Sequence, residues 1–226
     1  AVAATEAGAQ LIGMIFAPTR RRVPIGRARA IVEAVRTAAS ISKTFKTIDS
    51  MTEEEEEEEE EEEAAIDEDG GTPCSDVVIA DDVTGQSWFD FHARWISKSR
   101  RPLMVGVFQN QSAGYMARVA REVGLDIIQL HGQEPTEISR LLPVPTLRAF
   151  HLKSDEPIDT VAHLRREVRR EGYHALPLLD AFAVGAAHQG GQGVSIDVDL
   201  ATRVIAGSHD GGVQPKLPVI LAGGLN

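Results

Sequence analysis

The sequence predicts an α/β fold: a parallel (β/α)8 barrel of the TIM type that is incomplete, with about six of its eight strands. Short, wholly apolar runs alternate with amphipathic helical segments, which is the order of parallel β/α units whose strands are buried on both faces. Polar residues or glycines follow nearly every apolar run. They would converge on one mouth in a barrel but not in an open sheet, where the site gathers at a switch point. We therefore expect residues 1–226 to form a single partial barrel domain.

The elements follow one another in a regular order. A helix end is expected before Gly8, then a strand over 11–16 and an amphipathic helix that starts near Pro24. Further along the chain, continuous apolar runs predict strands over 103–108, 126–130, 146–150, 176–180 and 217–222. Helical spacing between these runs predicts helices over 112–123, 135–142, 158–170 and 198–206.

Residues 47–102 interrupt this order and are interpreted as an insertion. They contain eleven consecutive glutamates, Glu53 to Glu63, and a connection of this length in a compact domain is usually an insertion or disordered. We expect residues 51–82 to be disordered; an acidic arm that docks a partner is the alternative. Residues 87–98, with aromatic side chains at helical spacing, are expected to form a helix packed on the barrel. Removing these 56 residues leaves 170, fewer than the roughly 250 of a full barrel.

Composition excludes several classes of function. The net charge of -11 comes from the glutamate run, because the remaining chain has 23 acidic and 23 basic residues. With no basic stripe we expect no nucleic acid partner, and with no apolar run of roughly 20 residues we expect no membrane span. The single cysteine, Cys74, excludes an internal disulfide, and no Cys/His spacing predicts a metal site. A cytoplasmic protein is expected.

Two glycine-rich loops predict a phosphate site. The sequence GGQG places Gly190, Gly191 and Gly193 after the strand expected to end at Asp180, and AGGLN places Gly223 and Gly224 at the end of the next strand. Bare backbone amides in such loops can cradle an oxyanion, and the late strand ends of barrels commonly bind phosphate. A flexible hinge is the alternative for GGQG taken alone. Together the loops predict a phosphorylated small molecule as the ligand.

Three further positions carry candidate chemistry. Asp180 ends an apolar strand, where partial burial favours the protonated carboxyl group of a proton donor; the alternative is a helix N-cap. Arg20, Arg21 and Arg22 follow the first expected strand, and one guanidinium could hold a substrate carboxylate, although a solvated basic turn is the alternative. His131 is interpreted as a pocket wall, because no second histidine or carboxylate stands near it at metal-ligand spacing. Surface or packing positions are expected for His92, His151, His163, His174 and His188.

Five motifs in order resemble the phosphoribosylanthranilate isomerase family. They are GMIFAPTRRRV at 13–23, VGVFQNQ at 105–111, GLDIIQLHGQE at 124–134, the LLD and GGQG segments around 178–193, and LAGGLN at 221–226. The resemblance implies an Amadori rearrangement of N-(5-phosphoribosyl)anthranilate to a 1-amino-1-deoxyribulose 5-phosphate, without metal or organic cofactor. It implies that Asp180 protonates the furanose oxygen, Arg22 holds the anthranilate carboxylate, both glycine loops contact phosphate, and His131 lines the pocket.

The chain also departs from the family pattern. The family's first strand carries the general-base cysteine in a KICG motif, and its last strand carries a DVSSG-like motif; the present sequence starts after the former and ends before the latter. Cys74 lies in the acidic segment and is not expected to replace that base. We therefore expect the fragment to be nearly inactive, since loss of a positioned base costs roughly 10²- to 10⁴-fold in rate.

There are two alternatives to this interpretation. Indole-glycerol-phosphate synthase, a related phosphate barrel, would need lysine and glutamate at strand ends, and these are not seen there. A degenerate, non-catalytic phosphate-binding barrel or interaction module is the alternative from another class. The polyglutamate segment is similar to fungal sequences, in which this domain is commonly fused to other tryptophan-pathway domains.

Overall fold

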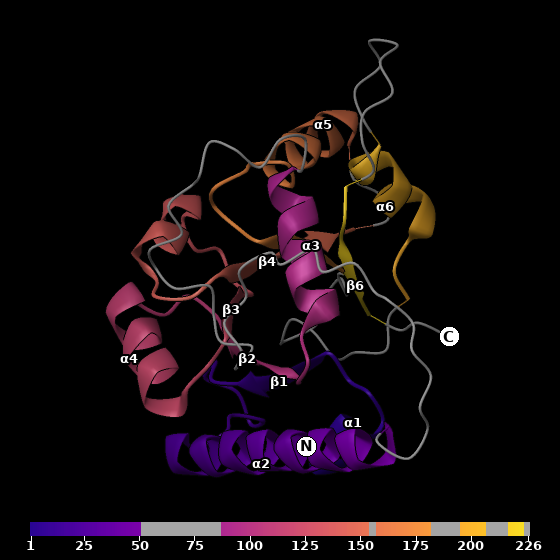
Figure 1. Ribbon diagram of the computed structural model, residues 1–226. Coiled ribbons are helices and arrows are strands. Elements are labelled where there is room, and N and C mark those ends of the chain that lie inside the picture. The colour runs from indigo at the N-terminus through magenta and orange to yellow at the C-terminus, as the bar shows by residue number, and fades with distance from the viewer. Residues whose placement is uncertain (51–86, 154–156, 182–194, 207–216, 224–226) are drawn as a thin grey trace.

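The computed structural model describes residues 1–50, 87–153, 157–181, 195–206 and 217–223 (Figure 1). The strands in this part of the chain are β1 (Leu11–Ile15), β2 (Leu103–Phe108), β3 (Ile127–Leu130), β4 (Thr146–Leu152), β5 (Leu176–Ala181) and β6 (Ile220–Ala222). The helices are α1 (Val2–Glu6), α2 (Ile25–Ser50), α3 (Trp88–Lys98), α4 (Ala113–Val123), the 3₁₀ helix η1 (Thr136–Leu141), α5 (Ile158–Glu167) and α6 (Val198–Ile205).

The six strands form one parallel sheet in the order β1-β2-β3-β4-β5-β6. Strands that are consecutive in the chain are neighbours in space throughout, and the order never reverses. A doubly wound open sheet would show such a reversal at its switch point. The sheet therefore has the strand order of a β/α barrel, and its curled form is the part of a barrel that the sequence predicts.

Alternate residues of β2 and β3 belong to two different core clusters. On one side, Met104 and Ile128 belong to a core cluster that includes residues of α2 and α4. On the other side, Val105 and Ile127 belong to a cluster that includes Phe89, Trp95 and Ile96 of α3. Figure 1 shows α2, α4, α5 and α6 around the rim of the sheet, with α3 crossing in front of the strands. The predicted helix over 87–98 is confirmed, and it packs on the sheet.

Helix boundaries follow from short-range capping. The Ser112 hydroxyl accepts a hydrogen bond from the Tyr115 amide at the start of α4, and Gly124 ends the helix in the left-handed conformation. The Ser87 hydroxyl accepts from the Asp90 amide at the start of α3, and the Asp197 carboxylate accepts from Leu200 at the start of α6. Each cap satisfies an amide that has no partner within its own helix.

A buried aspartate ties the amino ends of β2 and β3 together. Asp126 is 1% exposed, and both of its oxygens accept hydrogen bonds from Arg101, at 2.8 and 2.9 Å. Its Oδ2 also accepts from the Met104 amide at 2.7 Å, while Arg36 of α2 lies 3.7 Å from Oδ1. Because burying an unpaired charge is costly, this ion pair and its hydrogen bonds specify how the two strands align.

Several predicted boundaries are wrong. The helix expected over 135–142 is the 3₁₀ helix η1, α5 ends at Glu167 rather than 170, and β6 begins at Ile220 rather than 217. Two prolines account for part of this: Pro143 and Pro218 remove backbone donors close to these elements. The helix α2 continues to Ser50, four residues into the range assigned to the insertion. The segment 51–82, predicted to be disordered, lies outside the described residues.

His174 makes stability dependent on pH. It is 1% exposed and its Nε2–H donates to the Val168 carbonyl at 3.1 Å, whereas Nδ1 has no hydrogen-bond partner among the described residues. Burial lowers the pKa of this imidazole from 6.5 to about 4. The unfolded chain thus takes up a proton near pH 6.5 that the folded protein takes up only near pH 4. This contribution to stability is present above pH 6.5 and is lost as the pH falls towards 4.

We predict that lowering the pH from 7 to 5 removes about 2 kcal/mol of unfolding free energy through His174, since one pKa unit corresponds to ~1.4 kcal/mol. In His174→Gln, which keeps a donor for the Val168 carbonyl, the unfolding free energy should fall less between pH 7 and pH 5, as measured by urea unfolding at each pH. Some dependence should remain, because burial also lowers the pKa of His92. His163→Gln, at an exposed position in α5, is the control. An unchanged pH dependence in His174→Gln would contradict this assignment.

Candidate functional site

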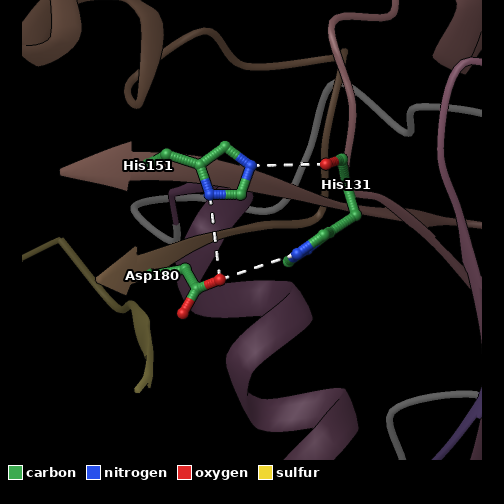
Figure 2. Close-up of side chains that lie close together, drawn as sticks. All are labelled: His131, His151 and Asp180. Carbon is green, nitrogen blue, oxygen red and sulfur yellow. Dashed lines mark hydrogen bonds and ion pairs between the residues drawn. The ribbon is translucent and has the colours of Figure 1, made fainter. Parts of the chain in front are cut away.

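Three side chains from the ends of neighbouring strands meet around one carboxylate (Figure 2). Asp180 Oδ2 lies 3.6 Å from His131 Nε2 and 3.7 Å from His151 Nδ1. The two imidazole rings stand perpendicular to each other, with centroids 4.9 Å apart. Asp180 is buried, and both histidines are only partly accessible, with side chains 14% and 16% exposed. The cluster is therefore enclosed but still reachable from solvent.

Strand register creates this cluster. His151 in β4 pairs directly with Asp180 in β5, so their side chains project from the same face of the sheet. On β3, Gln129 pairs with Leu147, which places His131, two residues later, on that face as well. All three positions lie at or just beyond the carboxyl ends of their strands, where parallel β/α folds carry their sites.

Hydrogen bonding fixes the orientation of His151. Its Nε2 lies 3.3 Å from the His131 carbonyl oxygen, which can only accept, so Nε2 carries a hydrogen. In the neutral ring, Nδ1 then turns a lone pair towards Asp180 Oδ2 (Figure 2). A proton on the Asp180 carboxyl group would face this lone pair across 3.7 Å. The pair can thus hold a proton at the centre of the cluster.

His131 is held in its neutral form. Burial lowers the pKa of this imidazole, the neighbouring His151 and Arg21 lower it further, and Asp180 and Glu134 act in the opposite direction. The amide nitrogen of Gln129 lies 3.2 Å from Nδ1.

The loop that carries His131 is clamped by a buried glutamate. Glu134 is 4% exposed, and its carboxylate accepts hydrogen bonds from the amides of Asn110 (2.7 Å) and Gly132 (3.0 Å). In return, Asn110 Oδ1 accepts from the Gln133 amide at 2.7 Å. The Glu134 carbonyl accepts from Arg148. These bonds join the loops after β2 and β3, and they position the backbone of His131, whose carbonyl orients His151.

Arg22 lies at a different place on the same edge of the sheet. Its Nη2 donates to the Tyr115 hydroxyl at 3.0 Å, and the guanidinium lines a cavity of about 350 Å³ together with Gln111, Ser112 and Tyr115. The Gln111 amide donates to the Phe16 carbonyl at the end of β1. This cavity offers a cationic guanidinium and several hydrogen-bonding groups, a set that suits an anionic ligand.

The structure places some of the predicted site residues, and others lie outside the described part of the chain. Asp180 and His131 are brought together, and Asp180 lies inside β5. Arg22 is exposed beside α4, and Gly223 follows β6 with a positive φ of 110°. The remaining predicted phosphate-binding glycines, Gly190, Gly191, Gly193 and Gly224, lie outside the described residues.

One prediction about the histidines was wrong. His151 was expected on the surface or in packing, but it contacts the buried carboxylate. The sequence has no second histidine or carboxylate at metal-ligand spacing from His131, but the fold brings one of each close to it. One donor atom from each of His131, His151 and Asp180 lies within 4.8 Å of the others. Strand alternation in the sequence places His151 on the same face as Leu147 and Ala149. The sequence does not give the β4–β5 register, however, so it could not show that His151 lies next to Asp180.

Comparison with known proteins identifies relatives. A model of the family described as N-(5'-phosphoribosyl)anthranilate (PRA) isomerase matches residues 52–226. A multifunctional tryptophan biosynthesis protein of Phycomyces blakesleeanus is 35% identical over 237 residues, which cover all of this chain and 26% of that protein. The N-(5'-phosphoribosyl)anthranilate isomerase of Komagataella pastoris is 32% identical over 196 residues, which cover 86% of this chain and 67% of that protein. The chain thus spans about a quarter of the length of its multifunctional relative.

The fold agrees with a solved structure. N-(5'-phosphoribosyl)anthranilate isomerase from Pyrococcus furiosus matches with a TM-score of 0.52 at 16% identity, over all of this chain and 72% of the archaeal one. At this identity the likeness concerns the fold alone. It confirms that the six parallel strands are arranged as in a β/α barrel of this kind.

We predict that Gly132→Ala destabilises the loop that carries His131. A Cβ at this position would lie 2.5 Å from Asn110 Oδ1 and 2.9 Å from the Asn110 backbone nitrogen, so the clamp must shift. The expected cost is roughly 1–3 kcal/mol in unfolding free energy. Gly114→Ala is the matched control, because no atom lies within 4 Å of its added Cβ and alanine suits a helix. Equal stability of the two variants would show that the clamp is not rigid.

Proposed function

Because this chain belongs to the N-(5'-phosphoribosyl)anthranilate isomerase family, we propose that its strand ends bind N-(5'-phosphoribosyl)anthranilate. We propose further that they take part in its Amadori rearrangement to 1-(2-carboxyphenylamino)-1-deoxyribulose 5-phosphate. One observation carries the proposal: a buried carboxylate stands between two imidazoles where three parallel strands end. Such a group can hold a proton away from bulk water and deliver it to a substrate oxygen.

Asp180 is the proton donor in this proposal. Protonation of the furanose ring oxygen lets the C1–O bond break, with the anilino nitrogen supplying its electron pair, so that the ring opens to an iminium ion. Loss of the C2 proton then gives an enolamine, which becomes the aminoketone when C1 takes up a proton. C1 is reduced and C2 oxidised within the same molecule, so no external electron donor or acceptor is consumed.

His131 and His151 support Asp180 in different ways. His151 Nδ1 faces the carboxyl group and can accept its proton, while the His131 carbonyl fixes the direction of that ring. His131, neutral through burial, forms a wall beside the reacting sugar. The single cysteine of this chain, Cys74, follows the glutamate run and is not proposed as the base that removes the C2 proton.

The two ends of the substrate would be held by the surrounding loops. Arg22 is proposed to bind the anthranilate carboxylate, because its guanidinium lines the cavity beside the ends of β1 and β2. The glycine loops at 190–193 and 223–224 are proposed to bind the phosphate through backbone amides. The similarity to multifunctional tryptophan biosynthesis proteins supports the proposal that this chain is one domain of a longer protein, and we propose a cytoplasmic location for it.

We predict that Asp180→Asn lowers kcat roughly 10²- to 10⁴-fold in the full-length protein, because it removes the proton donor but keeps the shape of the side chain. Affinity for a reduced, unreactive product analogue should change no more than a few-fold. Asp159→Asn, at an exposed position in α5, is the matched control and should be as active as the wild type. A kcat for Asp180→Asn within threefold of wild type would remove Asp180 from the mechanism.

We predict that Arg22→Ala acts on binding instead of chemistry. Loss of a charge-assisted contact costs roughly 1.5–3 kcal/mol, so KM should rise by about 10- to 100-fold while kcat changes little. Arg22→Lys should recover only part of the affinity, because an ammonium group cannot bind a carboxylate in bidentate fashion. Arg29→Ala, exposed in α2, serves as the charge control. If KM stays at the wild-type value, the proposed carboxylate contact is wrong.

A further inference from the structure

We propose that His131, His151 and Asp180 also bind a divalent transition metal ion, with Zn²⁺ as the best fit. Their donor atoms lie within 4.8 Å of one another, and Asp180 Oδ2 is 3.6 and 3.7 Å from the two nitrogens. With bonds of about 2.0–2.2 Å, tetrahedral zinc places neighbouring donor atoms roughly 3.3–3.5 Å apart. Closing the site around an ion (Figure 2) would shorten the two Asp180 distances by a few tenths of an ångström and bring the two imidazole nitrogens, now within 4.8 Å of each other, to about the same separation.

The surroundings of both imidazoles match those of metal ligands. A metal-binding histidine almost always donates its other N–H to a carbonyl, carboxylate or water. His151 does so, because Nε2 faces the His131 carbonyl oxygen and Nδ1 is left with a lone pair towards Asp180. For His131, Nδ1 lies against the Gln129 amide, 3.2 Å away. Turning that amide presents its oxygen to an Nδ1–H and leaves the Nε2 lone pair free for a metal ion.

Charge and burial also favour a cation at this point. The side chains of His131 and His151 are only 14% and 16% exposed and that of Asp180 only 7%, so a bound ion would be largely shielded from bulk water. Asp180 supplies one negative charge, and the nearby Glu134 adds to the negative potential, whereas Arg21 opposes it. All three ligand side chains keep some exposure, so an ion can enter from the mouth of the sheet.

The donor set selects the type of metal. Two imidazoles and one carboxylate suit Zn²⁺ or Co²⁺, whereas Mg²⁺ and Ca²⁺ prefer sites made of oxygen ligands. Three protein ligands leave a fourth position for water. The consequence for catalysis rests on the proposed function: an Asp180 carboxylate that ligates zinc cannot donate a proton. Zinc should therefore inhibit the isomerase in competition with its substrate.

The test measures metal binding directly. Full-length protein without an affinity tag is treated with a chelator, desalted and titrated with Zn²⁺ by calorimetry and with Co²⁺ by visible absorption. We expect one site of micromolar affinity, with the spectrum of tetrahedral Co²⁺, and no heat from Mg²⁺. His151→Gln should weaken binding at least tenfold. His163→Gln, an exposed histidine of α5, should bind like the wild type.

Two outcomes would overturn the site: absence of binding by the wild type, or equal Zn²⁺ affinity in wild type and His151→Gln. His131→Gln provides a second ligand variant if His151→Gln fails to fold in the presence of chelator, as judged by circular dichroism. Inhibition is measured separately. If zinc binds without inhibiting the enzyme, the metal site stands but Asp180 has no role in catalysis. If Asp180→Asn is inactive and the wild-type protein binds no zinc, Asp180 acts in catalysis but the metal site does not exist.

Discussion

The register between β4 and β5 is the constraint on which the site depends. It sets His151 directly opposite Asp180, and the β3–β4 register adds His131 to the same face. A slip by one residue would turn Asp180 into the layer of helices and leave a carboxylate among apolar side chains. At the opposite ends of the strands, Asp126 joins the Met104 amide to Arg101, which fixes how β2 and β3 align. The assembly of the site thus depends on the alignment of the strands in the sheet.

Much of this arrangement could be predicted, because the strands are recognisable in the sequence. Continuous apolar runs located five strands to within a residue or two, and the polar residue after the run LPLL pointed to Asp180. Boundaries that depend on tertiary contacts were harder: η1 takes the place of an α-helix, and only three residues of the last run form β6. The role of His151 in the site was not predicted, because the sequence around an isolated histidine in a strand does not indicate a function. Its role depends on a neighbour 29 positions away, and only pairing of the strands reveals it.

The same local chemistry supports both proposals for the cluster. A carboxylate removed from water gains from any positive partner, whether a proton or a metal ion. The two imidazoles approach it without donating a close hydrogen bond, because their nearest nitrogens remain 3.6 and 3.7 Å away. A site arranged in this way can keep a proton ready for a substrate oxygen, and by the same geometry it accepts a cation of suitable size. Catalysis would then depend on keeping such ions scarce.

The central claim is that Asp180, between His131 and His151, faces the reacting sugar where the strands end. A crystal structure of the full-length protein with a reduced, unreactive analogue of the aminoketose product tests it most directly. We expect a sugar oxygen of the analogue within hydrogen-bond distance of the Asp180 carboxylate, with both imidazoles beside it. An analogue bound elsewhere, or an Asp180 side chain that points into the outer layer of helices, would contradict it.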